Sequence, residues 1–554
     1  MKEILKEIVE RTYSACREEG MFTTPGMPDF VVEVPRNKSH GDLAVNLAMV
    51  LAKSEKRPPR EIALALLDNI KDDTGVIEKM EIAGPGFINF YLKETVWHTV
   101  LKRIEEEADR FGSCTMGNGT KIMIEFVSAN PTGPLHIGHG RGAAVGDAVA
   151  NILAFAGYEV EREYYINDVG VQMQNLGKSV FLRYCELLKK EVPFPDGLYR
   201  GSYIYGIAKE MILKHGGTLL ETPEQEAVGL CTAFASRRIL KDIQNDLELF
   251  GVHFDTWFSE KALFDSNDVQ ASIAYFKDRG LAYEKDGALW FKASEYGDEK
   301  DRVMIKEDGN TTYFTSDIAY HQNKFKRGFN HVVDIWGADH HGYIPRVRSF
   351  LSALDINQDA FHVILVQMVN LLRDGKPVAM STRAGEFVTL REVIDEVGTD
   401  AARFIFLTRR SDAQLDFDLD VAKKQNDENP VYYVQYAHAR ICSIISFAEE
   451  KDFAVPSFDD IDTALLCELE EIDLVKKLSH FPEVIEGSAR SYEPHRIAAY
   501  LQELVAQFHS YYNKHRVITD NRDLSTARLF LMSGIKRVLN NGLSLLGVYA
   551  PTKM

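Results

Sequence analysis

The spacing of hydrophobic residues changes along the chain between the helical period and the alternation typical of strands. Both patterns occur in the first part of the chain. They predict a helix through Ile4, Ile8 and Tyr13, an extended segment at 30–35, a helix at 43–52 and a strand at 86–92. Elements of these two kinds predict a small α/β domain over residues 1–115.

After a glycine-containing linker at 112–119, the pattern becomes that of a strand, a helix and a second strand. The expected elements are a strand at 121–127, a loop at 128–135, a helix at 138–156 and a strand at 160–166. Gly157 follows the helix in the position of a C-terminal cap. This order predicts a βαβ unit whose helix, rich in Gly and Ala, lies close to the sheet.

The next segment is mainly helical, and strand patterns return only after it. Residues 170–280 contain helical spacing broken by a turn-rich stretch at 193–197, and we interpret them as an insertion. Further strands are expected at 288–291, 331–336 and 361–369. Together with the βαβ unit they predict an open, doubly wound parallel sheet of the Rossmann-like type, in a domain over 116–420.

Strand patterns end near residue 420. Long amphipathic helices are expected after it, at 431–448, 461–481, 494–516 and 525–546. They predict an all-α domain over 421–554. A chain of 554 residues is too long for one hydrophobic core, so a division into three domains agrees with its length.

The composition indicates the cellular compartment in which the chain works. The N-terminus alternates charged and apolar residues, unlike a signal peptide, and no window has the long apolar run of a membrane span. The six cysteines are scattered without a Cys-x-x-Cys pair, so we expect neither a disulfide framework nor a structural zinc site. These features predict a cytoplasmic protein without a membrane partner.

The net charge of −18, from 64 basic and 82 acidic residues, argues against non-specific binding of polyanions. It does not exclude local basic surfaces. Lys53, Lys56, Arg57 and Arg60 form one basic cluster, which is either a solvated loop or a contact for nucleic acid.

The loop at 128–135 and the helix that follows it have the features of an anion site. A strand-to-helix loop bent by Gly and Pro points backbone N–H groups and the positive end of the helix dipole at a phosphate. His136 and His139 share a face there and can donate to phosphoryl oxygens. Two isolated histidines are more often surface or packed residues, and here the loop favours phosphate binding.

The string His136-Ile-Gly-His139, after a Pro-x-Gly loop at the first strand-to-helix crossing, resembles the nucleotide-binding signature of class I aminoacyl-tRNA synthetases. The longer string from Glu125 to His136 resembles the arginyl branch. In that branch the acidic strand residue and the asparagine five residues later bind arginine, which implies this role for Glu125 and Asn130, and for Ser128 between them. A carboxylate suits a planar guanidinium with five donors. Without the resemblance, an ion pair at a strand end explains Glu125 equally well.

Tyr313 and Asp317 resemble the Tyr-x-x-x-Asp element of the same family, in which the ring and the carboxylate complete the guanidinium pocket. On a helix these two positions share a face. Alternatively, Thr315 or Ser316 marks the helix start and Asp317 is an acidic residue of the first turn.

Polar residues also follow the strand expected at 331–336. They would lie at its carboxyl end, the usual place of ligands in open α/β sheets. The resemblance implies an arginine contact for Asp339 and ATP contacts for Gly337 and His340. A metal site at Asp339, His340 and His341 is the alternative, but no further ligand cluster supports it.

Residues 378–385 resemble the second signature of class I synthetases, normally Lys-Met-Ser-Lys-Ser. The resemblance implies catalytic roles for Met380, Ser381 and Arg383. In the family, lysines of this signature hold the triphosphate while pyrophosphate leaves.

Both lysines of that signature are replaced, by Ala379 and Thr382. Some arginyl enzymes keep a compensating lysine just before the first signature, where this chain has Gly133. Arg383 and Lys376 are therefore our candidates for the cation that serves the leaving group.

The flanking domains resemble those of arginyl enzymes as well. Residues 431–440 match the run that opens their anticodon-binding domain, and the chain end at 550–554 is also similar. Tyr432, Tyr433 and Tyr436 either stack on bases or pack in the core. Since residues 1–115 resemble the N-terminal tRNA-binding domain of the family, the resemblance spans nearly the whole chain.

The resemblance implies ATP-dependent ligation of L-arginine to tRNA(Arg) through an arginyl-adenylate, with Mg²⁺ entering as part of the ATP complex, by a monomer. The residues expected against ATP are Asn130, Pro131, Thr132, Gly133, Pro134, Leu135, His136, Ile137, Gly138, His139, Gly140, Gly337, His340, Met368 and Val369. The alternatives are a nucleotidyltransferase of the same superfold, a cysteinyl or glutaminyl synthetase, and an inactive tRNA-binding protein.

Overall fold

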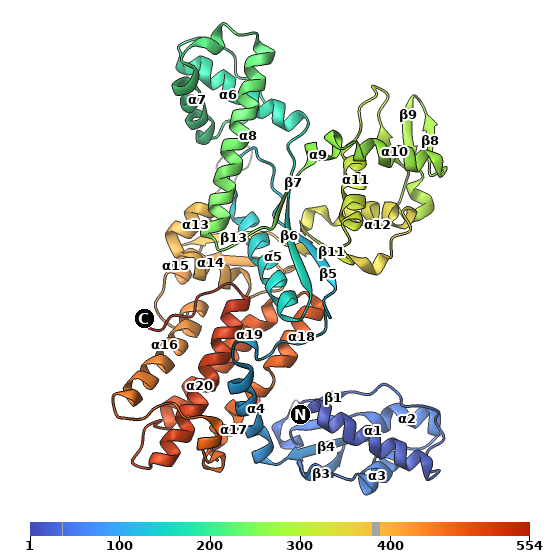
Figure 1. Ribbon diagram of the computed structural model, residues 1–554, viewed down its shortest axis with the longest axis vertical. Helices are drawn as coiled ribbons and strands as arrows, with labels where there is room; N and C mark the ends of the chain where they lie inside the picture. Colours follow the sequence, from blue (N-terminus) through green and yellow to red (C-terminus); the bar gives the residue numbers. More distant parts are fainter. Residues whose placement is uncertain (36, 379–387) are drawn as a thin grey trace. The chain divides into compact units, whose positions relative to one another are not determined.

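The computed structural model describes residues 1–35, 37–378 and 388–554 (Figure 1). These residues form two compact units. The first consists of Met1–Phe111, Ser443–Phe481 and Ala506–Val538, and the second of Gly112–Cys442, Pro482–Val505 and Leu539–Met554. Each unit therefore combines segments that are far apart in the sequence.

The N-terminal part of the first unit is built on an antiparallel sheet in the order β1-β2-β4-β3. Its strands are β1 (Val32–Glu33), β2 (Leu43–Val45), β3 (Ile77–Ala83) and β4 (Phe87–Leu92). Its helices are α1 (Lys2–Glu18), α2 (Leu47–Glu55), α3 (Pro59–Asn69) and α4 (Glu94–Glu107). The helix expected from residue 43 begins only at Leu47, because Leu43 pairs with Phe90 of β4 and both side chains are buried.

A parallel five-stranded sheet in the order β12-β11-β5-β6-β7 forms the centre of the second unit. Its strands are β5 (Lys121–Glu125), β6 (Glu159–Ile166), β7 (Thr256–Ser259), β11 (His331–Gly337) and β12 (Phe361–Val366). Helix α5 (Ile137–Phe155) connects β5 to β6 and lies against the sheet (Figure 1). The predicted doubly wound fold is thus confirmed. Strand β7 was not expected, because its four half-buried residues show no alternation.

The segment between β6 and β7 is helical and consists of α6 (Val171–Leu187), α7 (Ser202–His215) and α8 (Glu224–Leu249), which pack together (Figure 1). After β7 come α9 (Glu260–Asp265), α10 (Asp268–Asp278) and an antiparallel sheet of β8 (Ala282–Lys285), β9 (Ala288–Phe291) and β10 (Arg302–Ile305). The strand expected at 288–291 forms, but in this small sheet. Asp286 and Gly287 have φ angles of 51° and 74°, which closes a local hairpin between β8 and β9.

The elements next to the carboxyl end of β11 are α11 (Tyr313–Lys326), the short 3-10 helix η5 (Ala338–Tyr343) and α12 (Ile344–Ala353). A further sheet contains β13 (Val369–Arg373), β14 (Lys376–Pro377) and β15 (Leu415–Asp418), with helices α13 (Leu390–Val397), α14 (Thr399–Phe406) and α15 (Leu419–Ala422). The strand expected at 361–369 is therefore divided, since β12 ends at Val366 and Val369 begins β13.

The C-terminal part of the chain is helical, as predicted. Its helices are α16 (Pro430–Glu449), α17 (Leu469–Ser479), α18 (Phe481–Ser491), α19 (His495–Lys514) and α20 (Arg522–Leu545). The helix expected from residue 461 begins only at Leu469, after two short 3-10 turns. Helices α16, α19 and α20 contribute residues to both units.

Two fully buried arginines join distant segments of the second unit. Arg403 of α14 donates to Asp147 of α5 at 2.5 Å and to the backbone oxygen of Leu546 at 3.1 Å. Arg141 of α5 donates to the backbone oxygens of Gln367 and Ala413, each at 2.8 Å. These acceptors replace water around the guanidinium groups and offset the cost of burying them. Helix α5 is therefore held in place on two sides.

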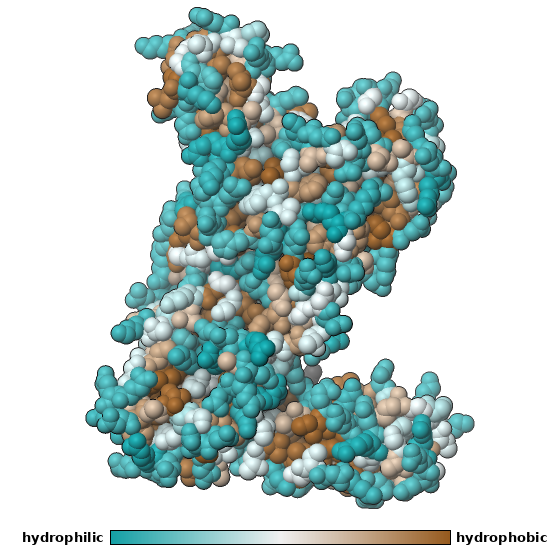
Figure 2. Space-filling model, in the orientation of Figure 1, coloured by the Kyte–Doolittle hydropathy of each residue, from teal (hydrophilic) through white to brown (hydrophobic). Residues whose placement is uncertain are grey.

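The surface seen in Figure 2 is mainly hydrophilic, with hydrophobic residues in small patches. In the described part of the chain, no helix combines the length and the apolar character that crossing a membrane requires.

Candidate functional site

The two histidines predicted to contact phosphate begin helix α5 and cap it with their own side chains. The Nδ1 atom of His136, the N-cap residue, accepts from the N–H groups of Gly138 at 3.1 Å and His139 at 3.4 Å. The Nδ1 atom of His139 accepts from the N–H of His136 at 3.2 Å, and the ring centroids are 3.6 Å apart. Because both Nδ1 atoms accept, each neutral ring carries its proton on Nε2.

Burial keeps both rings uncharged at neutral pH. It lowers the pKa of His136, and burial together with His136 lowers the pKa of His139 to about 3. The pair can therefore donate Nε2–H groups to phosphate without carrying positive charge. The positive end of the dipole of α5 adds electrostatic attraction for phosphate.

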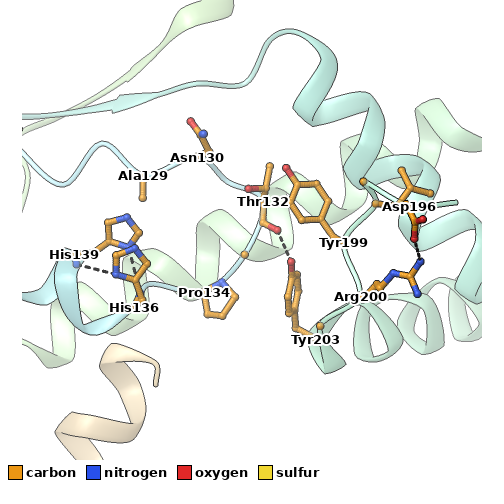
Figure 3. Close-up of a pocket in the computed structure, with 14 residues that line it drawn as sticks. Ala129, Asn130, Thr132, Pro134, His136, His139, Asp196, Tyr199, Arg200 and Tyr203 are labelled. Carbon is orange, nitrogen blue, oxygen red and sulfur yellow. Dashed lines mark hydrogen bonds and ion pairs between the residues drawn. The ribbon is translucent and has the colours of Figure 1, made fainter. Parts of the chain in front are cut away.

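His136 and His139 line a pocket of about 730 Å³, which we call the histidine pocket (Figure 3). One wall is the loop before α5, with Asn130, Thr132, Gly133 and Pro134. The opposite wall is the connection between α6 and α7, with Tyr199 and Arg200, together with Tyr203 in the first turn of α7. Figure 3 shows the histidines on one side of the loop, where it returns from its bend at Thr132, and Arg200 on the other side, beyond the bend. The helical insertion thus contributes to this pocket.

Tyr203 fixes the loop at Gly133. Its Oη donates to the backbone oxygen of Thr132 at 2.8 Å, and a Cβ at Gly133 would lie 3.2 Å from the same Oη. The ring of Tyr203 therefore takes the space that a side chain at position 133 would enter. Asn130 is held from the insertion as well, because its Nδ2 donates to Gln172 at 2.8 Å.

The chain just after the second-signature segment pairs with the first signature. Ile137 N–H donates to the oxygen of Val388 at 3.2 Å, and Leu390 N–H donates to the oxygen of Leu135 at 2.8 Å. The catalytic candidates of the second signature, and the two replaced lysine positions, lie outside the described residues: Met380, Ser381, Arg383, Ala379 and Thr382. Lys376 is exposed on β14 and lines none of the pockets described here.

A second pocket, of about 290 Å³, lies at the carboxyl ends of β5 and β11. We call it the carboxylate pocket, because its lining includes Glu125, Asp317 and Asp334. Three predicted positions besides Glu125 and Asp317 also line it: Ser128, Gly337 and His340. Ser128 is followed directly by Ala129 and Asn130 of the histidine pocket. The same loop therefore borders both pockets.

The carboxylates are held by buried partners. Lys324 of α11 is fully buried, and its Nζ lies 2.5 Å from Oε2 of Glu125 and 2.7 Å from Oδ1 of Asp334. Ser128 Oγ donates to the other oxygen of Glu125 at 2.8 Å. Burial raises the pKa of Glu125, and the charge of Lys324 opposes this effect.

Asp317 does not act as a helix-start residue. Helix α11 begins at Tyr313 with Thr312 as N-cap, so Asp317 lies beyond its first turn. Its carboxylate accepts a hydrogen bond from the Tyr343 hydroxyl. Burial raises the pKa of Asp317, and the bond from Tyr343 opposes the rise. Asp317 thus lines the carboxylate pocket, and its predicted contact with a guanidinium group stays a prediction.

Tyr313 lines a third pocket, of about 470 Å³, together with Glu260, Lys306 and Ser316. Tyr313 is 56% exposed, whereas Glu260 is 2% exposed and its Oε2 has no hydrogen-bond partner within the described residues. Burial raises the pKa of Glu260 to about 7. The sequence pattern did not reveal Glu260. It follows β7 directly, and recognition of that strand would have placed Glu260 at the carboxyl edge of the sheet.

Several predicted residues face away from these pockets. The side chain of Asp339 is 78% exposed and points back toward Gly337 on the 3-10 turn. Its carboxylate lies 3.7 Å from His340, whose side chain is also exposed. Among the residues expected against ATP, Leu135, Ile137 and Val369 are buried as core residues, Pro131 and Gly140 are also buried, and Met368 is 67% exposed.

Of the tyrosines in α16, Tyr432 stacks with Tyr436, with ring centroids 6.0 Å apart.

Three protein families match this chain, one over the region that holds both pockets and two over the flanking regions. Residues 106–425 match the family described as tRNA synthetases class I (R), catalytic domain. Residues 1–92 match the arginyl tRNA synthetase N terminal domain, and residues 434–554 match the DALR anticodon binding domain. The chain belongs to the arginyl-tRNA synthetases.

Related sequences match this chain over its full length. The chain is 53% identical to the arginine–tRNA ligase of Syntrophotalea carbinolica and 53% identical to that of Desulfosudis oleivorans, with 100% of each chain covered. A putative arginyl-tRNA synthetase structure from Campylobacter jejuni matches with a TM-score of 0.77 at 35% identity, over 84% of this chain and 100% of that one. Both pockets lie in the part that matches the catalytic domain of arginyl-tRNA synthetases.

Proposed function

We propose that this arginyl-tRNA synthetase joins L-arginine to tRNA(Arg) in two steps at the adjoining histidine and carboxylate pockets. The observation that carries the proposal is the loop from Glu125 to His136. It presents a carboxylate at one end and two neutral imidazole donors at the other. Arginine bound by its side chain in the carboxylate pocket would extend its own carboxylate toward the phosphate site.

In the first step, an arginine carboxylate oxygen attacks the α-phosphorus of ATP, and the bond to pyrophosphate breaks. Mg²⁺ enters with ATP as part of the substrate. The Nε2–H groups of His136 and His139 would donate to the phosphoryl oxygens as negative charge grows on them. In the second step, the 2′-hydroxyl of the terminal ribose of tRNA attacks the arginyl carbonyl and AMP leaves. No side chain of the protein acts as a nucleophile.

The guanidinium group is assigned to Glu125 and Asp317. A buried pocket with ionised acceptors suits a planar cation that keeps its charge. Asn130, Tyr313 and Glu260 lie at neighbouring positions and are proposed to bind the amino-acid end of arginine. A carboxylate such as Glu260 suits the α-ammonium group.

The cation that serves the leaving pyrophosphate is assigned to Arg383, with Lys376 as the weaker candidate. Arg200 is an additional candidate, because it lines the histidine pocket and its ion pair with the exposed Asp196 is available for exchange. Exposed pairs of this kind contribute little to stability, so phosphate can replace the carboxylate.

We further propose that the enzyme is cytoplasmic and monomeric and that it needs bound tRNA before it activates arginine. Free thiols at all six cysteines agree with a reducing compartment. Measurable ATP–pyrophosphate exchange with arginine in the absence of tRNA would contradict the last point.

The direct test is aminoacylation of total tRNA with each amino acid in turn. We expect arginine alone to be esterified, in a reaction that requires ATP. If another amino acid is esterified instead, the arginine assignment is wrong although the fold stands.

A further inference from the structure

A buried cation contacts two carboxylates that line the carboxylate pocket. Lys324 is 0% exposed, its Nζ contacts Glu125 and Asp334, and it lies 4.3 Å from the centre of the Tyr320 ring. Burial alone would lower the pKa of Lys324, but the charges of Asp334 and Glu125 outweigh it and raise the pKa. An ammonium group therefore lies behind two of the carboxylates that line the pocket proposed to bind the guanidinium group of arginine.

The position of Lys324 leaves Glu125 able to bind a second cation. Its Oε2 accepts from Lys324 and its Oε1 from Ser128. Each carboxylate oxygen has two lone pairs, so both oxygens can accept one more N–H. Ser128 Oγ itself accepts from the N–H of Tyr165 at 3.1 Å, which fixes its direction.

We propose that Lys324 is a positioning residue for arginine: its ammonium group pairs Glu125 with Asp334 and so keeps Glu125 charged and oriented as an acceptor for the guanidinium group. This role rests on the proposed function of the pocket. It assigns to Lys324 no contact with arginine.

Electrostatics explain why a resident cation is needed. Asp334 is buried and Asp317 is half-buried beside Glu125, and like charges close together favour protonation. Without Lys324, the pKa of Glu125 would rise further, and the protonated form would present an O–H donor to the N–H donors of arginine. The pocket would then lose one of its two acceptors for the substrate.

The charge of Glu125 depends on groups from several elements. The titratable groups that face it or its partners are Asp317, Tyr320, His321 and Lys324 of α11, Asp334 of β11, Glu163 and Tyr165 of β6, and Tyr343 of η5. Glu163 is paired separately with Arg327 and Tyr320, each at 2.6 Å. Lys324 is thus the cation in direct contact with Glu125 among the described residues.

The test compares Lys324→Gln, Lys324→Met and Lys324→Arg in arginine aminoacylation at saturating ATP and tRNA. Glutamine keeps hydrogen-bond donors but loses the charge, and arginine keeps the charge. We expect K324Q and K324M to raise KM for arginine at neutral pH, about tenfold for each unit by which the pKa of Glu125 then exceeds the assay pH. The change in kcat should be smaller, and K324R should have nearly the wild-type KM.

The pH profile separates this role from a merely structural one. As pH rises from about 6.5 to about 8.5, the ratio of variant KM to wild-type KM should fall, because Glu125 ionises again. Lys326→Met, at an exposed lysine two residues on, is the matched control and should behave as wild type. If K324M does not fold, K324Q carries the comparison.

Two outcomes overturn the inference: an unchanged KM in K324Q, or a KM raised by the same factor at every pH. Failure of the wild-type enzyme to esterify arginine would instead contradict the proposed function. The two failures are therefore distinguishable.

Discussion

The histidine pocket and the carboxylate pocket share one loop but are built in opposite ways. The first depends on neutral donors from neighbouring residues, His136 and His139, in a pocket of about 730 Å³. The second depends on charges from distant segments, Glu125, Asp317 and Asp334, in a pocket of about 290 Å³. The larger pocket suits ATP, which must enter and leave as a large anion. The smaller pocket suits the discrimination of a single side chain.

This difference has an energetic basis. Backbone N–H groups and helix capping hold the histidines locally, so their arrangement needs little from the rest of the protein. The carboxylates need buried cations and hydroxyl donors to remain charged. Substitutions in the carboxylate pocket should therefore act on arginine binding, and substitutions of the two histidines on the rate of the chemical step.

The largest effect is expected for Asp317→Asn, which keeps the size of the side chain and removes its charge. Loss of a buried acceptor for a charged partner should lower kcat/KM for arginine by about 1,000-fold, mainly through KM. Steady-state kinetics with varied arginine measures this. Tyr343→Phe, which removes only the donor to Asp317, serves as control and should cost much less. An equal loss in both variants would contradict the role of the charge.

His139→Asn should lower kcat by about 100-fold, because one donor to the developing charge is lost. KM for arginine should change little, in contrast to D317N. A rise in arginine KM as large as the fall in kcat would show that the two pockets are not separate in function. Thermal unfolding of the variant checks that α5 still forms.

Glu260→Gln should lower kcat/KM for arginine by about tenfold at pH 8 and remove a pH dependence. Since the pKa of Glu260 is about 7, the wild-type carboxylate ionises as pH rises through neutrality, and activity should rise with it. If kcat/KM of the wild type does not change with pH in this range, or if E260Q keeps the same pH dependence, Glu260 does not bind arginine.

The same carboxyl group affects stability with the opposite sign. Its pKa is raised in the folded state, so the unfolded chain ionises first and stability falls as pH increases from about 4.5 to about 7. The loss amounts to about 3 kcal/mol. E260Q should therefore unfold at a higher temperature than the wild type at pH 8 and at nearly the same temperature at pH 4.

The smallest effect is expected for Tyr203→Phe, which removes the hydrogen bond to Thr132 but keeps the ring. A single neutral hydrogen bond contributes about 1 kcal/mol, so KM for ATP should rise by roughly fivefold or less. Arginine KM should not change. A larger rise in KM for arginine than in KM for ATP would contradict the assignment of Tyr203 to the ATP-binding pocket.

The sequence predicted the fold class and the position of the two histidines at the start of one helix, because both depend on local patterns. His136 and His139 are close in sequence and begin one helix. The remainder depends on contacts between segments. Lys324 and Tyr343 have no motif, and their roles follow only from the packing of α11 against β11 and η5. The sequence analysis did not find Glu260, because it did not recognise strand β7 directly before it. The side chain of Asp339 points outward because the residue lies on a 3-10 turn.

Gly140 lies where helix α5 meets the segment that follows the second signature. A Cβ at this position would be 2.6 Å from Cδ1 of the fully buried Leu390 and 3.4 Å from the ring of Phe406. In evolutionary terms, positions 140 and 390 are constrained as a pair. A relative with alanine at 140 is expected to carry a smaller residue at 390, although 250 positions separate the two along the chain.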